Sequence, residues 1–496
     1  MDVMRDHLLI YLNGRALRLR GDDAFLTLAE FLRRQRQLTG TKVVCAEGDC
    51  GACAVLVGRV SAEGSRIRYV SVNSCIQLMF QLDATHVVTV EGLKHGEELN
   101  PIQKTMVSCH GTQCGFCTPG FVVSLCDLMQ KAEPVVAYDV RRALVGNLCR
   151  CTGYDSIVRA AMQADRSAMK SLDELYPPGN MLAELTRAGL QEVGIQATCA
   201  TFFKPVSIES AVYFRRENAN CLIVSGATDL GVQRNKGTRR FGAVMSCTAI
   251  RELQGIEITP RGLCIGAGAT LSQLERVSAT HLPELSRSLA QFGSPLIRNT
   301  ATLAGNLVNA SPIGDTIPAF FVLDGEVEIA GANSRRWINI DKFYRGYRQT
   351  VLKSDEIVTR MRLPIPAQGE VFKIYKVSKR KDLDISSFGA AIWMKMSGAR
   401  VEQIRIAFGG IAPVVVRLPR AEAFLSGKIG SRELFAEAGN IACGEISPIS
   451  DVRGTEGYRR VLAKNILVRF WQDIEGGESW PPMPSGSNSH ASGIRA

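Results

Sequence analysis

The sequence predicts a multidomain α+β protein, and three observations carry this prediction. The chain has 496 residues, which at roughly 150 residues per domain suggests about three domains. Hydrophobic residues make up 46% and charged residues 22%, as in ordinary globular proteins, so a disordered or fibrous chain is not expected. The apolar pattern changes from short alternating runs to helical spacing near residue 100, and to mixed strands and helices after residue 200.

Residues 5–92 are expected to form a small, strand-rich domain with one helix. Asn13-Gly14 stands between two apolar runs and is typical of a hairpin turn. Asp22 or Asp23 is expected to cap a helix over 25–32. The strands are predicted at 8–12, 16–19, 54–57, 67–72 and 86–90.

Residues 93–165 are expected to form a compact helical domain. Pro101 suits the first turn of a helix, where the missing N–H costs nothing. Residues 119–129 are apolar almost throughout, which indicates a buried helix. Asp139 is expected to cap a helix that runs through Leu144, and a further helix is predicted over 154–162.

The rest of the chain divides into four predicted parts. Residues 166–197 are expected to be a linker with some helix, since Pro177-Pro178-Gly179 continues neither a helix nor a central strand. Strands then alternate with helices in two successive predicted domains. The tail is rich in Ser, Pro, Gly and Asn, so it is expected to be disordered. These last three parts span 198–375, 376–476 and 477–496.

The cysteines are the most informative residues. The chain has 15 cysteines, of which ten lie between 45 and 151. No signal peptide is recognised, so metal binding or redox chemistry is favoured over disulfides. A C-x4-C-x2-C pattern, followed after 22 residues by a fourth cysteine, is the plant-type [2Fe-2S] ferredoxin spacing, while a structural zinc site is the alternative. This quartet is Cys45, Cys50, Cys53 and Cys75.

A second quartet lies in the predicted helical domain. A C-x2-C pair is followed 32 residues later by a C-x-C pair, a spacing that alone fits zinc and iron–sulfur equally. Its position beside a first [2Fe-2S] site favours a second cluster, because two clusters form a path for electrons. The quartet is Cys114, Cys117, Cys149 and Cys151. The other cysteines, including Cys109 and Cys126, are interpreted as packing thiols and His110 as a packed or surface histidine.

The residues around both quartets resemble those of a known family. Segments 113–120 (QCGFCTPG) and 146–154 (GNLCRCTGY) resemble the second iron–sulfur domain of the molybdenum hydroxylases, and 45–53 (CAEGDCGAC) resembles the first. The family includes xanthine dehydrogenase, aldehyde oxidase and carbon monoxide dehydrogenase. The resemblance implies a β-grasp ferredoxin-like domain and a four-helix-type domain, each with a [2Fe-2S] cluster. It also implies that Gln113 hydrogen-bonds the pterin of a molybdopterin cofactor in another subunit.

Two glycine-rich segments, 222–231 and 292–315, follow. Such a loop between strand and helix offers N–H groups to a pyrophosphate, and an ordinary strand–turn–helix corner is the alternative. Gly266-Ala267-Gly268 is rejected as a Rossmann motif, because Leu271 stands where a third glycine belongs. Ser272 and Glu275 are expected to form a capping box instead.

Together the two segments resemble the FAD domain of the same family, which belongs to the vanillyl-alcohol-oxidase-like class. By that resemblance, loop 224–231 cradles the FAD pyrophosphate and ribityl chain. The candidate FAD contacts are Val224, Ser225, Gly226, Ala227, Thr228, Asp229, Leu230, Gly231, Phe292, Thr302, Gly305, Asn306, Asp315 and Lys376, with Val358 as a weaker candidate.

Segments further along extend the resemblance over about 5–475. Residues 375–382 resemble the family's flavin-side loop, in which Lys379, Arg380 and Lys381 are suited to attract the phosphates of NAD. A solvated basic loop is the alternative. Segments 409–413 and 448–453 resemble the C-terminal flavoprotein domain that follows the FAD domain.

The order of the domains implies a role. Two clusters followed by FAD, with no molybdenum domain before 475, resemble the small subunit of bacterial xanthine dehydrogenases. This implies electron transfer from a large subunit, which binds molybdopterin and oxidises hypoxanthine or xanthine, through both clusters and FAD to NAD⁺. No residue of this chain is then catalytic in substrate oxidation, and an (αβ)2 heterotetramer is expected. An aldehyde oxidase or other hydroxylase, a stand-alone electron carrier, and O₂ as acceptor are the alternatives.

The charge and hydropathy patterns argue against nucleic acid as a partner and against a membrane span. Lys and Arg number 59 against 48 Asp and Glu, a net charge of +11. No block of five or six consecutive basic residues indicates nucleic acid, and no apolar run approaches the ~20 residues of a membrane span. A cytoplasmic protein is therefore expected, and the resemblance implies a role in purine catabolism. Only the loop at 376–381 gives part of the charge a role.

Overall fold

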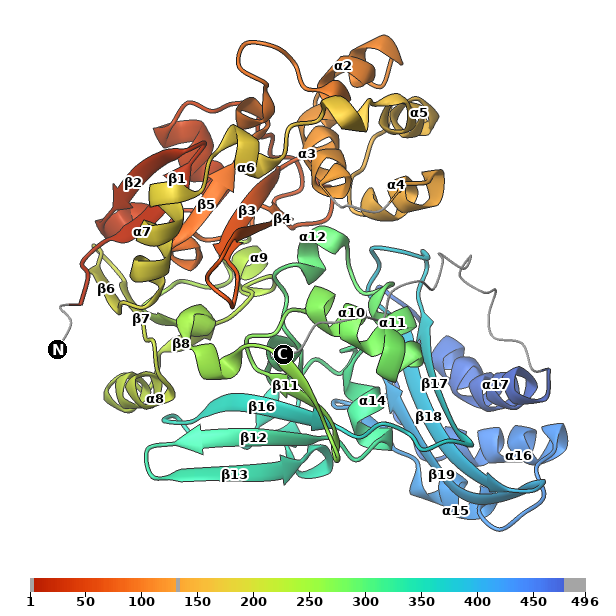
Figure 1. The fold of residues 1–496 in the computed structure, drawn as a ribbon. Helices are drawn as coiled ribbons and strands as arrows, with labels where there is room; N and C mark the ends of the chain where they lie inside the picture. The colour runs from red at the N-terminus through yellow and green to blue at the C-terminus, as the bar shows by residue number, and fades with distance from the viewer. Residues whose placement is uncertain (1–3, 131–133, 477–496) are drawn as a thin grey trace.

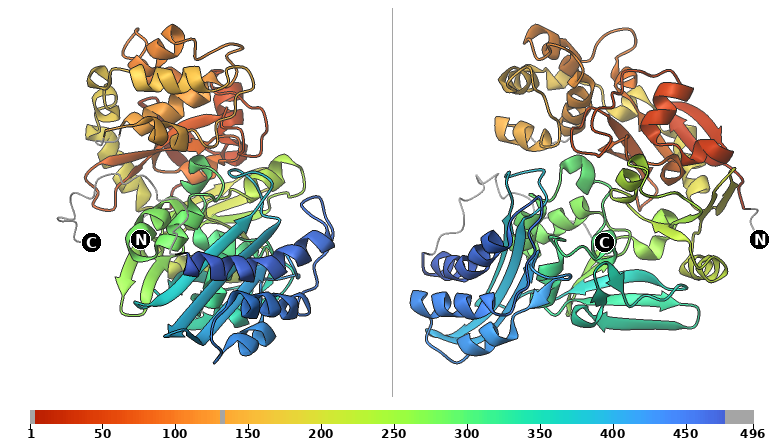
Figure 2. Two further views of the ribbon diagram at one scale, coloured as in Figure 1. Left: turned by 90° about the vertical axis from the view of Figure 1, so that its right-hand side faces the viewer. Right: turned by 180° about the vertical axis from the view of Figure 1, so that it is seen from behind.

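The computed structural model describes residues 4–130 and 134–476 (Figure 1). Its first third forms the upper half of the molecule, and the remaining domains form the lower half (Figure 2). No helix in the described ranges combines the length and apolarity that crossing a bilayer requires. The tail predicted at 477–496 lies outside the described residues.

The first domain is a mixed sheet of five strands in the order β2-β1-β5-β3-β4. The predicted hairpin is confirmed, and both of its turn residues have positive φ, +46° at Asn13 and +81° at Gly14. Strand β5 pairs parallel with β1 and antiparallel with β3. The strands are β1 (Leu8–Leu12), β2 (Arg15–Leu19), β3 (Ala54–Val60), β4 (Ile67–Asn73) and β5 (Thr85–Val88).

The helix of this domain begins later than expected. Asp22 and Asp23 lie in a 3-10 turn, Gly21–Phe25, so neither caps the helix, and that prediction is wrong. Thr27 is the N-cap of helix α1 (Leu28–Glu30), which continues as a π turn, Phe31–Gln35. Thr27 Oγ1 accepts from the Glu30 N–H at 3.2 Å, and Glu30 accepts from the Thr27 N–H at 2.8 Å. This reciprocal pair satisfies N–H groups that a helix start leaves open.

Four helices form the second domain: α2 (Pro101–Ser108), α3 (Thr118–Met129), α4 (Ala137–Ala143) and α5 (Asp155–Gln163). Helix α3 is buried along most of its length and packs on β3, as its apolar sequence predicts. Pro101 stands at the first turn of α2, which confirms its expected place. Asp139 is not the cap of α4, because the helix begins at 137. Its carboxylate lies in the first turn and accepts from the Val136 N–H at 3.0 Å.

The expected linker is ordered. It contains α6 (Leu172–Leu175) and α7 (Gly179–Gly189), which packs on the first sheet. It ends in β6 (Val193–Gln196), which pairs antiparallel with β7 (Thr201–Lys204). Residues 193–196 therefore form a strand of the next sheet rather than a connecting segment.

Three sheets and a layer of helices form the next described region. The first sheet has the order β6-β7-β9-β8, the second β10-β11-β16-β12-β13, and the third is the pair β14-β15. The cap of α10 is Thr270 with Gln273, so the predicted box of Ser272 and Glu275 is wrong, and Ser272 Oγ instead donates to Asn299 Oδ1 at 2.7 Å. The strands are β8 (Leu222–Val224), β9 (Ala243–Ser246), β10 (Ile256–Thr259), β11 (Gly262–Gly266), β12 (Glu326–Gly331), β13 (Ser334–Asn339), β14 (Tyr344–Gly346), β15 (Gln349–Thr350) and β16 (Ile357–Leu363). The helices are α8 (Ile208–Glu217), α9 (Leu230–Asn235), α10 (Leu271–His281), α11 (Pro283–Leu289), α12 (Pro295–Arg298), α13 (Leu303–Asn309) and α14 (Ile317–Val322).

The last domain is an antiparallel sheet, β17-β18-β19-β20, with helices on one face (Figure 2). Alternate residues of β18 point to opposite faces. Phe388 and Ile392 join the core under the helices, whereas Ala391 and Trp393 join the core that contains α14. The elements are β17 (Glu370–Val377), β18 (Phe388–Ser397), β19 (Arg400–Gly409), β20 (Val416–Arg417), α15 (Pro419–Leu425), α16 (Arg432–Cys443) and α17 (Glu456–Glu475).

A buried ion network joins the first sheet to β7. Lys204 Nζ lies 2.5 Å from Asp83 Oδ2, and Arg5 contacts the same carboxylate at 2.7 Å. The Asp83 and Lys204 side chains are almost completely buried. Burial alone would raise the pKa of Asp83, but Lys204 and Arg5 outweigh it and lower that pKa. The network therefore keeps the carboxylate charged within the domain interface.

We expect Lys204→Met to lower the free energy of unfolding by about 3 kcal/mol, because removing one partner of a buried pair leaves charge poorly compensated. Urea unfolding followed by circular dichroism measures the loss. Arg20→Met is the matched control, since Arg20 pairs with Asp6 in solvent, and it should leave the midpoint unchanged. Equal midpoints for both variants would contradict a stabilising role for Lys204.

Candidate functional site

A cavity of 1220 Å³ lies where the middle and last domains meet the first domain. It exceeds the ~300–1,000 Å³ of most small-ligand pockets, so it has room for a dinucleotide. Its wall is formed by loop 225–230, segment 301–315 and residues 383–386. Glu47 and Asp49 from the first cysteine loop also line it. Segments that are far apart in the sequence thus line a single cavity.

Most of the predicted flavin contacts line this cavity. Val224 does not, because it is the buried end of β8. Gly231 packs behind the wall, where a Cβ would lie 2.3 Å from the Ile76 carbonyl oxygen. Those that do line it are Ser225, Gly226, Ala227, Thr228, Asp229, Leu230, Phe292, Thr302, Gly305, Asn306, Asp315, Lys376 and Val358.

Loop 225–229 is shaped by close packing. Gly226 lies against residue 300, and a Cβ there would stand 2.1 Å from the Thr300 carbonyl oxygen. Ala227 follows with φ +55°. The amide of Gln81, from the first domain, donates to the Ser225 carbonyl at 2.9 Å. The loop is therefore held from two sides while its open side faces the cavity.

A polar triad lies in the wall opposite the loop. Lys376 Nζ lies 2.5 Å from Asp315 Oδ2 and donates to Ser386 Oγ at 2.9 Å. Ser386 Oγ in turn donates to Asp315 Oδ1 at 2.5 Å. The predicted pair Asp315 and Lys376 is thus in direct contact, and Ser386, which the sequence did not single out, completes the triad.

A buried arginine was also missed. Arg459, from α17, binds both carboxylate oxygens of Asp451 at 2.8 and 2.9 Å, and both residues line the cavity. Burial raises the pKa of Asp451, but the hydrogen bond from Arg459 and further hydrogen bonds outweigh it and lower that pKa. From the sequence, segment 448–453 was recognised only by its resemblance to a domain. The partner of Asp451 is a single arginine in the long helix α17, and a lone arginine in a helix gives no sequence signal.

The basic loop does not reach the cavity wall with its cations. Lys379 Nζ donates to the Val452 carbonyl at 3.0 Å, and Arg380 pairs with Asp384 at 3.6 Å. The lining residues come from the second half of this loop, starting at Leu383. A direct role of the three basic side chains in binding phosphate stays a prediction.

The first cysteine quartet lies beside the cavity. Cys45 is within hydrogen-bonding range of Cys50 and Cys75, and Cys53 of Cys75. The hydrogen bond with Cys50, and a second with Cys75, lowers the pKa of the Cys45 thiol. Helix α9 holds the loop, since Asn235 Nδ2 donates to the carbonyls of Ala46 and Cys75, each at 2.8 Å.

The second quartet comes together between α3 and α5. Cys151 Sγ lies 3.6 Å from Cys114 Sγ, and Cys117 is within hydrogen-bonding range of Cys149. Among the described residues, no three or more His, Cys, Asp or Glu side chains are arranged to hold one metal ion. The thiols approach in pairs, an arrangement that suits a [2Fe-2S] cluster, in which the four cysteines are shared between two irons.

The two quartets adjoin each other. The Leu148 N–H, next to Cys149, donates to the Cys50 carbonyl at 3.0 Å. Gly120 lies so close that a Cβ would stand 2.1 Å from the Gly51 carbonyl oxygen. The predicted pterin contact, Gln113, is exposed beside Cys114. The second quartet is the more exposed of the two, since Cys114 and Cys151 face the solvent while Cys53 and Cys75 are buried.

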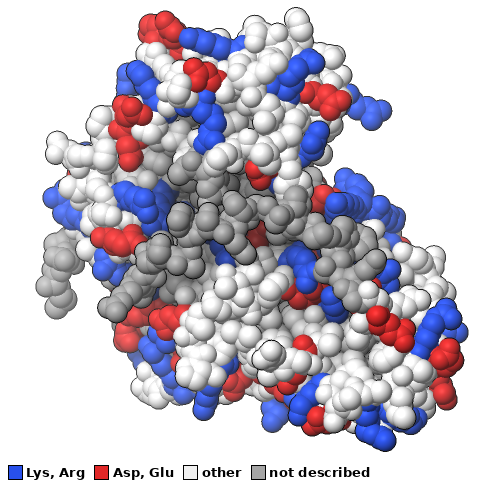
Figure 3. Space-filling model, turned by 45° about the vertical axis from the view of Figure 1, so that its right-hand side comes forward, with Lys and Arg blue, Asp and Glu red and all other residues white. Residues whose placement is uncertain are grey.

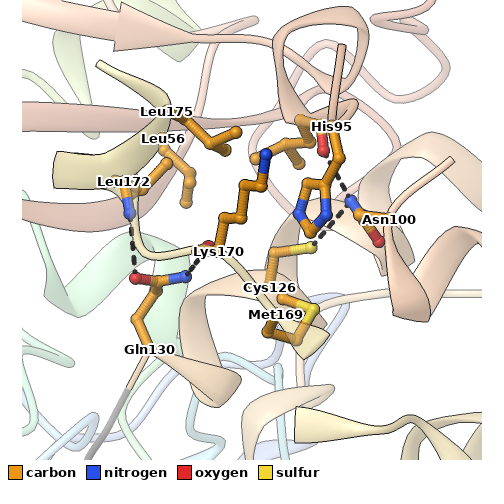
Figure 4. Close-up of a pocket in the computed structure, with 10 residues that line it drawn as sticks. Leu56, His95, Asn100, Cys126, Gln130, Met169, Lys170, Leu172 and Leu175 are labelled. Carbon is orange, nitrogen blue, oxygen red and sulfur yellow. Dashed lines mark hydrogen bonds between the residues drawn. The ribbon is translucent and has the colours of Figure 1, made fainter. Parts of the chain in front are cut away.

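A second cavity, of only about 10 Å³, lies where the linker covers the helical domain (Figure 4). It has room for at most one water. Cys126 lines it, accepts from Asn100 Nδ2 at 3.6 Å, and has its pKa raised to about 12 by burial. Both features fit the interpretation of Cys126 as a packing thiol.

The residues fit the groups that the sequence implies. Three features of the large cavity are relevant. Gly226 in loop 225–229 packs against backbone where a Cβ would stand, helices α9 and α13 begin at the wall, and the side chain of Lys376 is buried. Helix N-termini and a cation suit the pyrophosphate of FAD. Eight thiols in two groups suit two clusters.

Comparison with known domain families gives three matches. Residues 89–162 match a [2Fe-2S] binding domain, 196–366 match the FAD binding domain in molybdopterin dehydrogenase, and 373–474 match the CO dehydrogenase flavoprotein C-terminal domain. The chain therefore contains a [2Fe-2S] binding domain and an FAD binding domain like that of molybdopterin dehydrogenases.

Curated proteins similar to this chain include xanthine dehydrogenases. Xanthine dehydrogenase of Emericella nidulans is 30% identical over 95% of this chain and 39% of its own length. Xanthine dehydrogenase/oxidase of Rattus norvegicus is 26% identical over 95% of this chain and 39% of its own. The chain thus spans about two fifths of the length of these curated relatives.

Among solved structures, carbon monoxide dehydrogenase from Hydrogenophaga pseudoflava superimposes with a TM-score of 0.52 at 26% identity. The match covers 54% of this chain and 94% of that one. Quinoline 2-oxidoreductase from Pseudomonas putida 86 gives a TM-score of 0.52 at 25% identity, over 55% and 96% of the two chains. Solved structures that are named for different substrates are therefore similar to this chain.

Proposed function

We propose that this chain is the electron-transfer subunit of a xanthine dehydrogenase. It receives electrons from a molybdopterin-binding large subunit that oxidises hypoxanthine or xanthine, and delivers them through two [2Fe-2S] clusters and FAD to NAD⁺. When bound, FAD supplies the conversion between the single electrons of the clusters and the hydride of NADH.

The continuous series of contacts from the second quartet to the large cavity carries the proposal. Leu148, beside Cys149, donates to the Cys50 carbonyl. Glu47 and Asp49, on either side of Gly48 in the same loop, line the cavity. Among the residues that the structure describes, no other domain separates the quartets from the cavity, and this order supports the proposed path.

Within the cavity, the chain's residues have distinct positioning roles. Loop 225–229 is rigidly backed by residue 300 and by Gln81, so its backbone suits a fixed contact with phosphate. Lys376 supplies positive charge and is oriented by Asp315 and Ser386. The loop and the lysine approach the cavity from different domains and would position the cofactor from two sides.

The proposed large subunit would dock over the second quartet. Cys114 and Cys151 are exposed there, together with Phe116 and Leu148, whose exposed fractions are 48% and 44%. Exposed apolar side chains next to a metal site are typical of a surface that a partner covers. Gln113 lies on this surface and is proposed to contact the pterin, and an (αβ)2 assembly is proposed for the complete enzyme.

An assay of the complex purified from its native cells tests the proposal. Xanthine should reduce NAD⁺, and the complex should contain molybdenum, about four irons (two for each cluster) and one FAD for each copy of this chain. Oxidation of an aldehyde, carbon monoxide or a quinoline-type heterocycle in place of xanthine would assign the chain to another molybdenum hydroxylase. A molybdenum-free monomer would favour the stand-alone carrier.

A further inference from the structure

A group of basic side chains lies beside the first quartet. Two short segments, 33–36 and 234–240, contribute Arg33, Arg34, Arg36, Arg234, Lys236, Arg239 and Arg240, which we call the basic ridge. Four carboxylates lie among them: Glu30, Glu47, Asp49 and Asp229. On the face shown in Figure 3, by contrast, positive and negative side chains are interspersed.

Direct contacts join the two segments of the basic ridge. Arg234 Nη2 lies 3.1 Å from Glu30 Oε2, and Arg33 and Arg34 follow Glu30 by one helical turn. Val232 and Ala29 pack together round Cys53 and Cys75. The two segments therefore flank the first quartet on one continuous surface.

The ridge continues to the rim of the quartet. Lys236 Nζ lies 2.8 Å from Glu47 Oε1, two residues after Cys45. Arg34, Arg36, Lys236, Arg239 and Arg240 are all exposed. Only Lys236 and Arg234 of the seven cations have a carboxylate partner that contacts them, within the described ranges. The ridge thus presents uncompensated positive charge at the edge of the first cluster site.

We propose that the basic ridge is the docking surface for a small acidic one-electron carrier protein. The carrier would take electrons at the first cluster, as a second exit beside NAD⁺. This rests on the proposed function, because it needs the first quartet to hold a cluster. Each carrier gains one electron, so two are reduced for each substrate molecule oxidised, and no bond or proton changes in this step.

Charge complementarity favours this partner. Short-lived redox complexes bury little surface, so opposite charge supplies most of their rate of encounter. Electrostatic steering raises such rates by ~10- to 1,000-fold at low salt and is lost at high salt. A surplus of positive charge at the edge of a redox centre meets this requirement, and of the seven cations only Arg239 also lines the large cavity.

Stopped-flow mixing tests the proposal. The purified complex, photoreduced anaerobically, is mixed with rubredoxin, an acidic iron protein, or with a basic cytochrome c. We expect rubredoxin reduction to slow by at least about tenfold between 20 and 500 mM salt, and cytochrome c reduction not to slow. Equal salt dependence for both acceptors would overturn the proposal.

A charge-reversal variant locates the surface. Arg34→Glu/Arg36→Glu/Arg240→Glu should slow rubredoxin reduction at low salt by at least about tenfold while NAD⁺ reduction is unchanged. Arg420→Glu/Lys428→Glu/Arg432→Glu, on the last domain, is the matched control and should have no effect. An unchanged rate of rubredoxin reduction in the ridge variant would contradict docking. Docking would also be contradicted if the complex bound duplex DNA at the ridge at 150 mM salt and the bound DNA did not change the rate of rubredoxin reduction. Iron and flavin contents distinguish a failure of the docking proposal from a failure of the proposed function. If the proposed function is wrong, the protein will hold no iron–sulfur cluster that a carrier could reoxidise.

Discussion

Replacing Cys53 with serine should remove one of two iron–sulfur signals and leave the flavin in place. Cys53 is 1% exposed and lies against Cys75, so its thiolate has no substitute among solvent-facing groups. We expect the iron content to fall from about four to about two per chain. Xanthine-driven NAD⁺ reduction should fall by more than about 100-fold, because outer-shell partners alone cost 10- to 100-fold. Low-temperature EPR and metal analysis measure the change.

Cys126→Ala is the control for this variant. Cys126 is also buried and lies in the same half of the molecule, but it belongs to neither quartet. Both cluster signals and most of the activity should survive its loss. Two intact signals in Cys53→Ser, or a lost signal in Cys126→Ala, would refute the assignment of ligands.

Gly226→Ala should release the flavin and retain the clusters. The new Cβ would stand 2.1 Å from the Thr300 carbonyl oxygen and 2.8 Å from Ala301 Cα, and backbone atoms have little freedom to move away. Overpacking of this kind costs about 1–3 kcal/mol, which corresponds to a ~10- to 100-fold weaker affinity for FAD when the loop shifts. The ratio of flavin to iron in the purified complex measures the loss.

Gly242→Ala provides the matched control, because a Cβ at Gly242 meets nothing within 4 Å. Its flavin content should equal that of the unaltered chain. Full flavin occupancy in Gly226→Ala would show that loop 225–229 does not position the cofactor.

The sequence predicted the features that depend on residue type and local spacing. Asn13-Gly14 determined a turn because both residues tolerate positive φ. Helix α3 was predicted because its apolar run has to be buried. The cysteine spacings could be recognised because the cysteines of each motif, apart from Cys75, share a short loop. The contacts between loops, such as Cys114 with Cys151, come from the fold.

Features that depend on tertiary contact were not predictable. Ser386 joins Asp315 and Lys376 only because β17, its following loop and the loop before α14 meet at the cavity. Arg459 binds Asp451 across the turn that precedes α17. The helix caps at Thr27 and Thr270 were misplaced because several nearby residues are equally able to cap, and packing decides which one does.

The distribution of the +11 net charge over the surface could not be predicted from the sequence. The loop at 379–381 attracted attention because its cations are consecutive, yet Lys379 and Arg380 contact neighbouring protein atoms. The basic ridge is assembled from two segments about 200 residues apart, and only the fold makes them adjacent.

The central claim is that one chain holds two [2Fe-2S] clusters and FAD in an electron-transfer path. Quantitative EPR of the dithionite-reduced complex, with iron and flavin determined on the same sample, tests it most directly. We predict two distinct signals, each near one spin per chain, with about four irons and one FAD. A single signal with two irons, or zinc in either quartet, would contradict the account.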